Sequence, residues 1–250
     1  MMISRRNFLK RVSLISLPLI FKPIAILNAE ESSCQENQKK RVIWITRHGM
    51  RQDNIDPNWA KTAKNPDDPP LAQEGRLQAI ETGRFLSNQN VQLIYSSPFL
   101  RCIQTAGLIA NILKVPVRVE YGLSEALSTK WFSKMPDLSS ITELKKEFEW
   151  VDEAYKSVVI PSFPENEAKD TWERCARTMQ KILIDTTGNI LLVGHGASVA
   201  GMIKALTGTD EKANYNFCGL NRIEPTETGW ILRWSGDDHL SIRGDQIKSK

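Results

Sequence analysis

Short apolar runs rich in β-branched residues alternate with longer helical patterns from residue 41 onward. Each run has the length of a buried strand, and each longer segment repeats its apolar residues at helical spacing. The expected strands are residues 41–46, 91–95, 115–120 and 189–193, and the expected helices are residues 73–89, 98–113, 166–185 and 197–206. This alternation predicts an α/β fold in which a mostly parallel central sheet is flanked by helices.

Three other segments complete the expected organisation. Residues 50–72 are polar and rich in Pro and Asp, which predicts a long loop. Residues 121–164 are irregular apart from a helix near 141–149, and residues 219–235 predict two more strands. No linker interrupts residues 41–240, so we expect one domain, followed by a polar tail at 241–250.

The helical pattern of residues 73–89 predicts that Leu77, Ile80 and Phe85 face the core. The cysteines form no CxxC pair, which argues against a zinc ribbon or a thioredoxin-like site. Two of them lie in apolar helical patterns typical of small buried thiols, and the sequence leaves any disulfide pairing open. The four cysteines are Cys34, Cys102, Cys175 and Cys218.

The first 29 residues are typical of an export signal. A basic region precedes a short apolar stretch, about half the length of roughly 20 residues that a membrane-spanning helix needs. The segment SRRNFLK at 4–10 resembles the bacterial twin-arginine signal, which is read by a dedicated translocation machinery. We therefore expect export to the periplasm or beyond, no stable membrane insertion, and a flexible mature N-terminus at 30–40.

The charge balance changes once this signal is set aside. The whole chain has a formal net charge of +4, but five of its 33 basic side chains lie within the first 29 residues, which contain no acid. The remaining 28 basic side chains face 29 acidic ones, a net charge of −1. A nearly neutral body gives no electrostatic reason to expect nucleic-acid or membrane-surface binding.

Polar residues follow three of the predicted strands. RHG occupies 47–49, SSPFLR occupies 96–101, and GHG occupies 194–196. Ligands of such sheets bind beyond the carboxyl ends of the strands, so we expect these side chains to meet. Glycine after each histidine would let the backbone approach a ligand closely. The third histidine, His239, lies in a polar segment and is expected at the surface.

Two imidazoles and three guanidiniums gathered at one place indicate an anionic ligand. Arginine presents forked donors that match phosphate oxygens, and a neutral imidazole is a competent nucleophile toward phosphorus. A metal site formed by His48, His195 and a carboxylate is the rival interpretation. It is disfavoured because the histidines show no metal-binding spacing and the arginines would repel a cation. We therefore expect neither metal nor cofactor.

At these residues the chain resembles the histidine phosphatase superfamily, in its phosphoglycerate-mutase-like branch 1. The similar segments are RHG at 47–49, PPLAQEGRLQA at 69–79, SSPFLRCIQTA at 96–106 and LLVGHG at 191–196. The resemblance implies the three-layer fold of that family for residues 41–240. It also implies hydrolysis of phosphate monoesters, with no cofactor.

The resemblance further implies a role for each matching position. His48 would be the phosphorylated nucleophile, and Glu125 would be the proton donor. The phosphate pocket would consist of Arg47, Arg51, Arg101 and His195. Glu120 is a nearby competitor for the donor role, and Asp53 is a weaker candidate.

Within the superfamily, the spacing of the motifs resembles the ecdysteroid-phosphate and UBASH3/TULA-like phosphatases, and Trp59, Asp68 and Trp131 fit that group. Ala126 departs from it, because TULA-like enzymes tend to have Trp after the acid. The segment 124–128 also departs from the ERxxG-type loop of mutases. Residues 121–164 are expected to cover the pocket, with an apolar rim from the aromatic residues Trp131, Phe132, Trp150 and Tyr155.

These observations predict an exported phosphomonoesterase that acts through a phosphohistidine intermediate on a small or aromatic phosphate ester. Three alternatives stay open: a phosphoprotein or phosphohistidine phosphatase, a phosphoglycerate mutase, and an inactive phosphate-binding protein. Homodimer formation is likewise left open by the sequence.

Overall fold

The structure is a computed structural model that describes residues 41–243. At its centre lies a six-stranded sheet with the order β3-β2-β4-β1-β5-β6. The strands are β1 (Ile43–Arg47), β2 (Leu93–Ser96), β3 (Val117–Val119), β4 (Ile190–Gly194), β5 (Leu220–Pro225) and β6 (Trp230–Gly236). Strands β3, β2, β4 and β1 run parallel, whereas β5 and β6 are antiparallel additions at one side.

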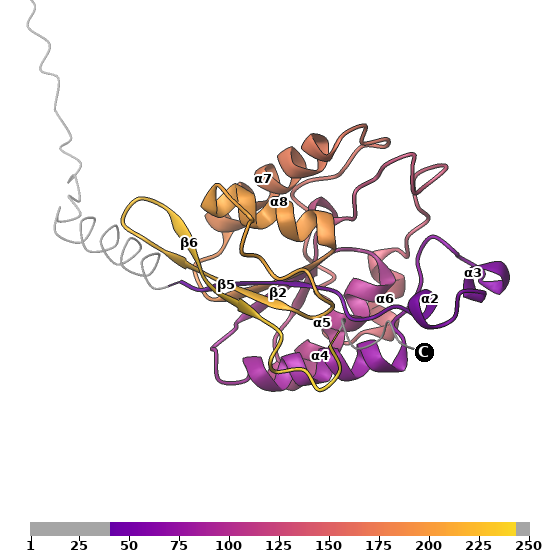
Figure 1. Ribbon diagram of the computed structural model, residues 1–250, viewed down its shortest axis with the longest axis horizontal. Coiled ribbons are helices and arrows are strands. Elements are labelled where there is room, and N and C mark those ends of the chain that lie inside the picture. Colours follow the sequence, from indigo (N-terminus) through magenta and orange to yellow (C-terminus); the bar gives the residue numbers. More distant parts are fainter. Residues whose placement is uncertain (1–40, 244–250) are drawn as a thin grey trace, which may run out of the picture.

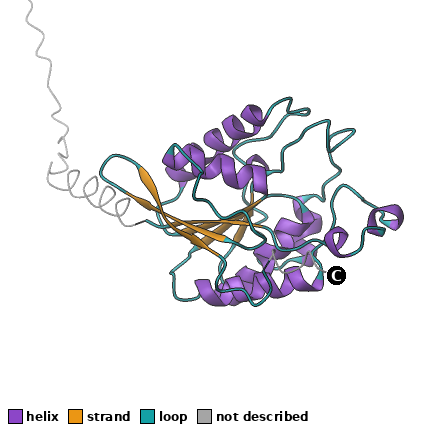
Figure 2. Cartoon of the chain, viewed as in Figure 1, coloured by secondary structure: helices purple, strands orange, loops and turns teal. Residues whose placement is uncertain are grey.

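Helices cover both faces of the sheet (Figure 1). Helices α4 and α5 lie together below the sheet in this view, and α7 and α8 lie together above it. The helical elements are α2 (Gln52–Ile55), α3 (Trp59–Thr62), α4 (Gln73–Leu86), α5 (Leu100–Leu113), the 3₁₀ turn η1 (Tyr121–Leu123), α6 (Ile141–Glu147), α7 (Ala168–Asp185) and α8 (Gly196–Thr207). The predicted α/β class with three layers is therefore confirmed (Figure 2).

The two interfaces between sheet and helices follow from strand alternation. Successive side chains of a strand point to opposite faces, so a strand buried on both sides is apolar throughout. In β1, Ile43 and Ile45 pack in the core between the sheet and helices α7 and α8. Trp44 packs on the opposite face, in the core between the sheet and helices α4 and α5. The continuous apolar runs in the sequence thus reflect a sheet with no solvated face at its centre.

Every predicted strand and helix has a counterpart, with ends shifted by a few residues. The expected loop at 50–72 was wrong in part, because it contains α2 and α3. Each of these is four residues long, too short for a periodic apolar pattern. The expected signal, the segment 30–40, most of the tail and Cys34 lie outside the described residues. Within residues 41–243, no helix is long and apolar enough to cross a membrane.

The inward face of α4 differs from the prediction. Leu77 and Phe85 are each 36% exposed and Ile80 is half-buried, whereas α4 buries Leu86 together with small and polar residues. Small residues let α4 and α5 approach closely, and buried Gln78 accepts a hydrogen bond from the Met50 backbone at 2.9 Å. Phe85 stacks on Trp234 of β6, with ring centroids 5.9 Å apart. Close helix packing and a polar anchor therefore override the apolar periodicity.

The prediction of small buried thiols is confirmed. Cys102 and Cys175 are fully buried and unpaired, and burial raises the pKa of Cys175 to about 11. Cys218 is also buried and free. A neutral thiol in an apolar setting behaves as a small hydrophobic side chain, and these three contribute to the core in that way.

A main-chain contact joins α4 to the segment after β1. A Cβ built on Gly75 would lie 2.1 Å from the Met50 carbonyl oxygen, and one built on Gly49 would lie 2.5 Å from the Gly75 carbonyl oxygen. Neither neighbour can yield, because both are backbone atoms. Gly49 is therefore required by packing against α4, whereas a Cβ on Gly196 would meet nothing within 4 Å. Packing against α4 is thus a sufficient reason for glycine at position 49.

Replacing Gly75 by alanine should destabilise the fold and displace the segment after β1. We expect Gly75→Ala to lower the free energy of unfolding by about 1–3 kcal/mol, the usual range for overpacking. Gly196→Ala is the matched control and should leave stability unchanged or slightly raised, since alanine favours the helix. Urea denaturation measures both, and equal stability of the two variants would contradict the assigned contact.

Candidate active site

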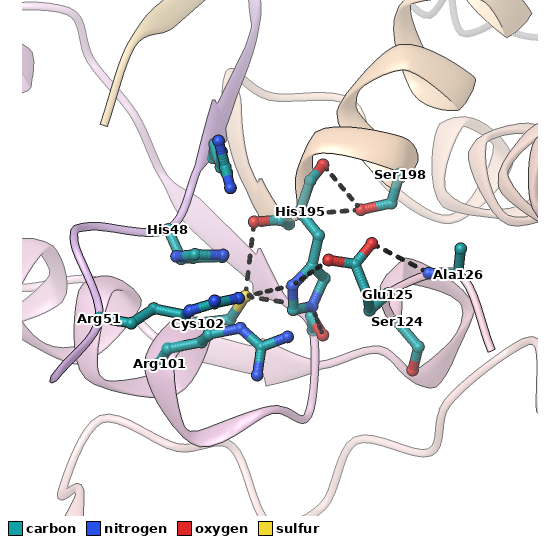
Figure 3. Close-up of polar contacts among 12 residues, drawn as sticks. His48, Arg51, Arg101, Cys102, Ser124, Glu125, Ala126, His195 and Ser198 are labelled. Carbon is teal, nitrogen blue, oxygen red and sulfur yellow. Dashed lines mark hydrogen bonds and ion pairs between the residues drawn. The ribbon is translucent and has the colours of Figure 1, made fainter. Parts of the chain in front are cut away.

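The parallel pairing of β1 with β4 brings the two strand-end histidines together. Arg47 and Gly194 are the last paired residues, and the His48 backbone N–H donates to the Gly194 carbonyl at 2.9 Å. His48 and His195 follow directly, and their rings meet edge to face with centroids 5.3 Å apart (Figure 3). The predicted meeting of these residues at one sheet edge is therefore what the structure shows.

His48 has the form of a poised nucleophile. Its ring is fully buried, and Nδ1 donates a hydrogen bond to the Gly49 carbonyl at 2.8 Å. A carbonyl only accepts, so Nδ1 carries the proton and Nε2 keeps its lone pair. Nε2 has no hydrogen-bond partner. Burial, and then the charges of Arg101 and Arg47, lower the pKa of His48 well below 6.5, so the ring is neutral.

His195 is held on both ring nitrogens. Nε2 lies 2.8 Å from the Ser97 hydroxyl, which follows β2, and Nδ1 lies 3.5 Å from the Glu125 carboxyl. The backbone N–H of His195 donates to Ser198 in the first turn of α8. Burial, and then the charge of Arg101, lower its pKa well below 6.5. This imidazole is therefore neutral and tightly oriented.

Glu125, the predicted proton donor, lies beside His195 and lines the cavity that contains the arginines. It follows η1, is 7% exposed, and accepts one hydrogen bond from the Ala126 backbone at 3.0 Å. Burial raises its pKa, although Arg101 and the Ala126 bond oppose the shift. A raised pKa favours the protonated carboxyl, and Figure 3 shows that group facing His195. A buried, protonated carboxyl can give its proton to a nearby oxygen.

The two competing acids have other partners. Glu120 is fully buried and accepts hydrogen bonds from five donors, among them Tyr155 at 2.7 Å and Ser157 at 2.7 Å. Its carboxylate is thereby occupied in holding residues 155–159. Asp53 forms a two-pronged ion pair with Arg51, with both N–O distances at 2.9 Å. Glu125 alone of the three contacts a ring nitrogen of His195.

The three predicted arginines share one cavity of about 440 Å³ with Glu125. Arg101 is nearly fully buried, and the Nε atoms of Arg47 and Arg101 are buried without a hydrogen-bond partner. Burial lowers the pKa of both guanidiniums; Glu125 opposes this shift, and the positive charge of Arg51 adds to it. Such crowded, unpaired donors match an oxyanion, which would satisfy them and neutralise their repulsion.

Asp68 and Phe217 contact these arginines and help to position them. Asp68 accepts from the Leu100 backbone N–H at 2.9 Å, at the start of α5, and lies 3.4 Å from Arg101. Burial raises the pKa of Asp68 to about 6. Phe217 lies beneath Arg47, with the guanidinium carbon 4.3 Å from the ring centre. Asp68 was among the residues that resemble the ecdysteroid-phosphate and UBASH3/TULA-like phosphatases, whereas nothing in the sequence indicated Phe217.

Thr105 also supports the site, because its hydroxyl accepts from the Gly49 backbone at 3.0 Å. It lies one helical turn after Arg101 on α5, so helical spacing from Arg101 could have indicated it. Ser97 also supports the site through His195, and its position directly after β2 was visible in the sequence.

Only part of the predicted aromatic rim lies at the cavity. Trp131 and Phe132 line it, and Trp131 is 58% exposed. Trp150 packs instead against the core between the sheet and helices α4 and α5, and the Tyr155 hydroxyl donates a hydrogen bond to Glu120. His239, expected at the surface, is partly buried because it packs on Phe85 and contacts the Thr82 hydroxyl at 3.0 Å.

The described part of the chain offers no ready metal centre. Within residues 41–243, no group of three or more His, Cys, Asp or Glu side chains is arranged to hold a metal ion. The donors that converge at the cavity are guanidiniums, which repel cations and attract oxyanions. The arrangement suits the capture of a phosphoryl group beside a neutral imidazole.

Comparison with known proteins agrees with this geometry. Residues 43–238 match the model of the histidine phosphatase superfamily, branch 1. The chain belongs to this family. The match spans the whole sheet and all three strand-end segments, so the resemblance predicted from the motifs is confirmed.

Two curated relatives belong to the predicted subgroup. The chain is 28% identical over 232 residues to human ubiquitin-associated and SH3 domain-containing protein A, covering 77% of this chain and 35% of that protein. It is 29% identical over 240 residues to the ecdysteroid-phosphate phosphatase of Drosophila melanogaster, covering 78% and 32%. The chain thus spans about a third of the length of these two relatives.

A solved structure confirms the fold. The ecdysone phosphate phosphatase from Bombix mori, in complex with tungstate, superposes with a TM-score of 0.66 at 23% identity. The match covers 76% of this chain and 91% of that one. At this identity the likeness concerns the phosphoglycerate-mutase-like architecture alone.

The state of His48 can be tested directly. We expect its ring to remain neutral well below pH 6.5, with the proton on Nδ1, because burial and two cations oppose a second proton. Two-dimensional ¹H–¹⁵N spectra of the imidazoles measure this, with assignment by the His48→Gln variant. The chain unfolded in urea is the control. Titration of the folded ring near 6.5, its ordinary pKa, would contradict the assignment.

Proposed function

We propose that this chain is an exported phosphomonoesterase that acts through a phosphohistidine intermediate. The observation that carries the proposal is the unpartnered Nε2 of a neutral His48, buried beside the unpaired Nε atoms of Arg47 and Arg101. A nucleophile and anion donors are thus placed together before any substrate binds. Preorganised charge of this kind is the main source of catalysis in phosphoryl transfer.

In the first step, the Nε2 lone pair of His48 attacks phosphorus while the ester P–O bond breaks. The leaving oxygen takes its proton from the Glu125 carboxyl, and the products are an alcohol and a phosphorylated His48. The ring becomes cationic, and the hydrogen bond from Nδ1 to Gly49 stabilises that charge. The positive charges of Arg47, Arg51 and Arg101 offset the negative charge on the phosphoryl oxygens.

In the second step, water attacks phosphorus and the P–N bond breaks. Glu125, now a carboxylate, takes a proton from the water, and inorganic phosphate leaves as neutral His48 is restored. Both steps need Glu125 within reach of the oxygen opposite Nε2.

A second cavity supports a small or aromatic ester as the substrate. This cavity of about 390 Å³ shares Trp131 with the phosphate cavity, and Ala126 and Trp172 also line it. Ala126 follows the proton donor directly, and its small side chain leaves room there. Flat apolar walls suit the alcohol part of an aromatic ester.

The proposal is tested by hydrolysis of 4-nitrophenyl phosphate by residues 30–250 with EDTA present. We expect turnover that survives EDTA and is lost in His48→Ala, because the nucleophile is the imidazole itself. Acid-sensitive labelled phosphate should be trapped on the wild-type chain and be absent from His48→Ala. Arg118→Ala, which removes an arginine paired with Asp152 outside the cavity, is the matched control and should retain activity.

The other outcomes separate the alternatives. Loss of turnover in EDTA would favour a metal site, and interconversion of phosphoglycerates would favour a mutase. Faster hydrolysis of phosphopeptides than of small esters would favour a phosphoprotein phosphatase. Phosphate binding with no turnover on any ester would favour an inactive binding protein.

Export through the twin-arginine pathway is a separate proposal, supported by the sequence of residues 1–29. We expect Arg5→Lys combined with Arg6→Lys to leave the full-length chain in the cytoplasm, since the pathway reads the arginine pair. Cell fractionation of a bacterial host measures this. Equal delivery of the variant and the wild type to the periplasm would refute the assignment.

A further inference from the structure

One buried ion pair outside the phosphate cavity contacts the segment that carries Glu125. Arg174 lies on α7 and is 1% exposed, and Glu165 lies just before α7 and is 5% exposed. Arg174 Nε lies 2.6 Å from one Glu165 oxygen, and Nη2 lies 3.0 Å from the other. Although burial opposes both charges, their mutual bonds raise the pKa of Arg174 and lower that of Glu165. Both groups are therefore ionised.

The remaining donors of Arg174 all go to the backbone before and at the proton donor. Nη1 donates to the carbonyls of Gly122 at 2.7 Å and Ser124 at 3.0 Å. Nη2 donates to the carbonyl of Glu125 itself at 3.0 Å. All five N–H groups of the guanidinium are thus used, three of them on this one segment.

Glu165 holds the backbone on the other side of the donor. Its carboxylate accepts from the Leu127 N–H at 2.9 Å, and its own N–H donates to the Leu127 carbonyl at 2.7 Å. The Thr171 hydroxyl supplies a further hydrogen bond to the same carboxylate at 2.7 Å. The backbone is therefore fixed at Gly122, Ser124, Glu125 and Leu127 by a single ion pair.

The Glu125 side chain has little support of its own. Its carboxyl has one hydrogen bond, from the adjacent Ala126, and a contact of 3.5 Å with His195 (Figure 3). Its location therefore depends on where its backbone lies. We propose that the Arg174–Glu165 pair is a positioning device for the proton donor, which holds residues 122–127 so that the Glu125 carboxyl reaches the leaving oxygen. This rests on the proposed function.

The test uses the dependence of proton donation on the leaving group. A basic alkoxide cannot leave without a proton, whereas 4-nitrophenolate leaves with little assistance. Arg174→Lys keeps the positive charge but cannot make five hydrogen bonds, so Glu125 should lose its position. We expect kcat/KM for methyl phosphate to fall by about 100-fold, within the range of general-acid catalysis, and that for 4-nitrophenyl phosphate by less than about 5-fold. Glu125→Gln should show the same selective loss.

A matched control lies at the other end of the same helix. Arg41 is 2% exposed and donates to the Thr186 carbonyl at 2.6 Å and the Leu183 carbonyl at 3.3 Å, at the end of α7. Arg41→Lys therefore removes a buried guanidinium of similar contacts without touching residues 122–127. We expect Arg41→Lys to lower the free energy of unfolding. Any change in kcat/KM should be the same for methyl phosphate and 4-nitrophenyl phosphate.

The double variant Glu125→Gln with Arg174→Lys gives a second measurement. If Arg174 acts through Glu125, the double variant loses no more selectivity than Glu125→Gln alone. Should Arg174→Lys fail to fold, Glu165→Gln keeps the shape of the pair and is judged by the same comparison of esters.

Uniform loss on both esters in an active, folded Arg174 or Glu165 variant would overturn the positioning role and leave the proposed function intact. The same selective loss in Arg41→Lys would also overturn it. A wild-type chain that hydrolyses neither ester would instead overturn the proposed function, and the positioning role with it.

Discussion

The pairing of β1 with β4 is the constraint on which the rest of the site depends. These two central strands run parallel and end level with each other, so the residues after them are brought together whatever their separation in the sequence. The hydrogen bond from His48 to Gly194 fixes that alignment at its last rung. Ser97, after the neighbouring β2, joins the same edge and orients His195. Hydrophobic burial of both sheet faces thus sets the geometry of a polar site.

Burial also sets the protonation states that the proposed mechanism requires. A buried imidazole loses its charge and a buried carboxyl gains a proton, because a low dielectric disfavours ions of either sign. The neighbouring arginines reinforce the neutral state of His48 and oppose the raised pKa of Glu125. For Glu125, burial is the larger effect. One physical environment therefore leaves His48 with a free lone pair and favours the protonated form of Glu125, the two states that the proposed mechanism uses.

The sequence predicted the features that are local or topological. Short apolar runs identified the strands, and their ends identified His48, His195 and Arg101. The resemblance to the family implied Glu125, which the structure places beside His195. Features that arise from tertiary packing were missed. The inward face of α4 is set by its close approach to α5, and the contact of Phe217 with Arg47 comes from a loop with no periodic pattern. Arg174 reads in sequence as an ordinary helical arginine, because its five acceptors lie on other segments.

The contact between Gly49 and Gly75 has a consequence for how this protein can change. Main-chain atoms meet directly there, so any larger side chain would force α4 and the segment that carries His48 apart, and none could bring them closer. Elsewhere a substitution in one partner can be compensated by a complementary substitution in the other. At this contact the chain has no such freedom, since glycine is already the smallest residue. Substitutions can therefore reshape the outer face of α4 and the rim of the cavity, while the position of His48 relative to α4 stays the same.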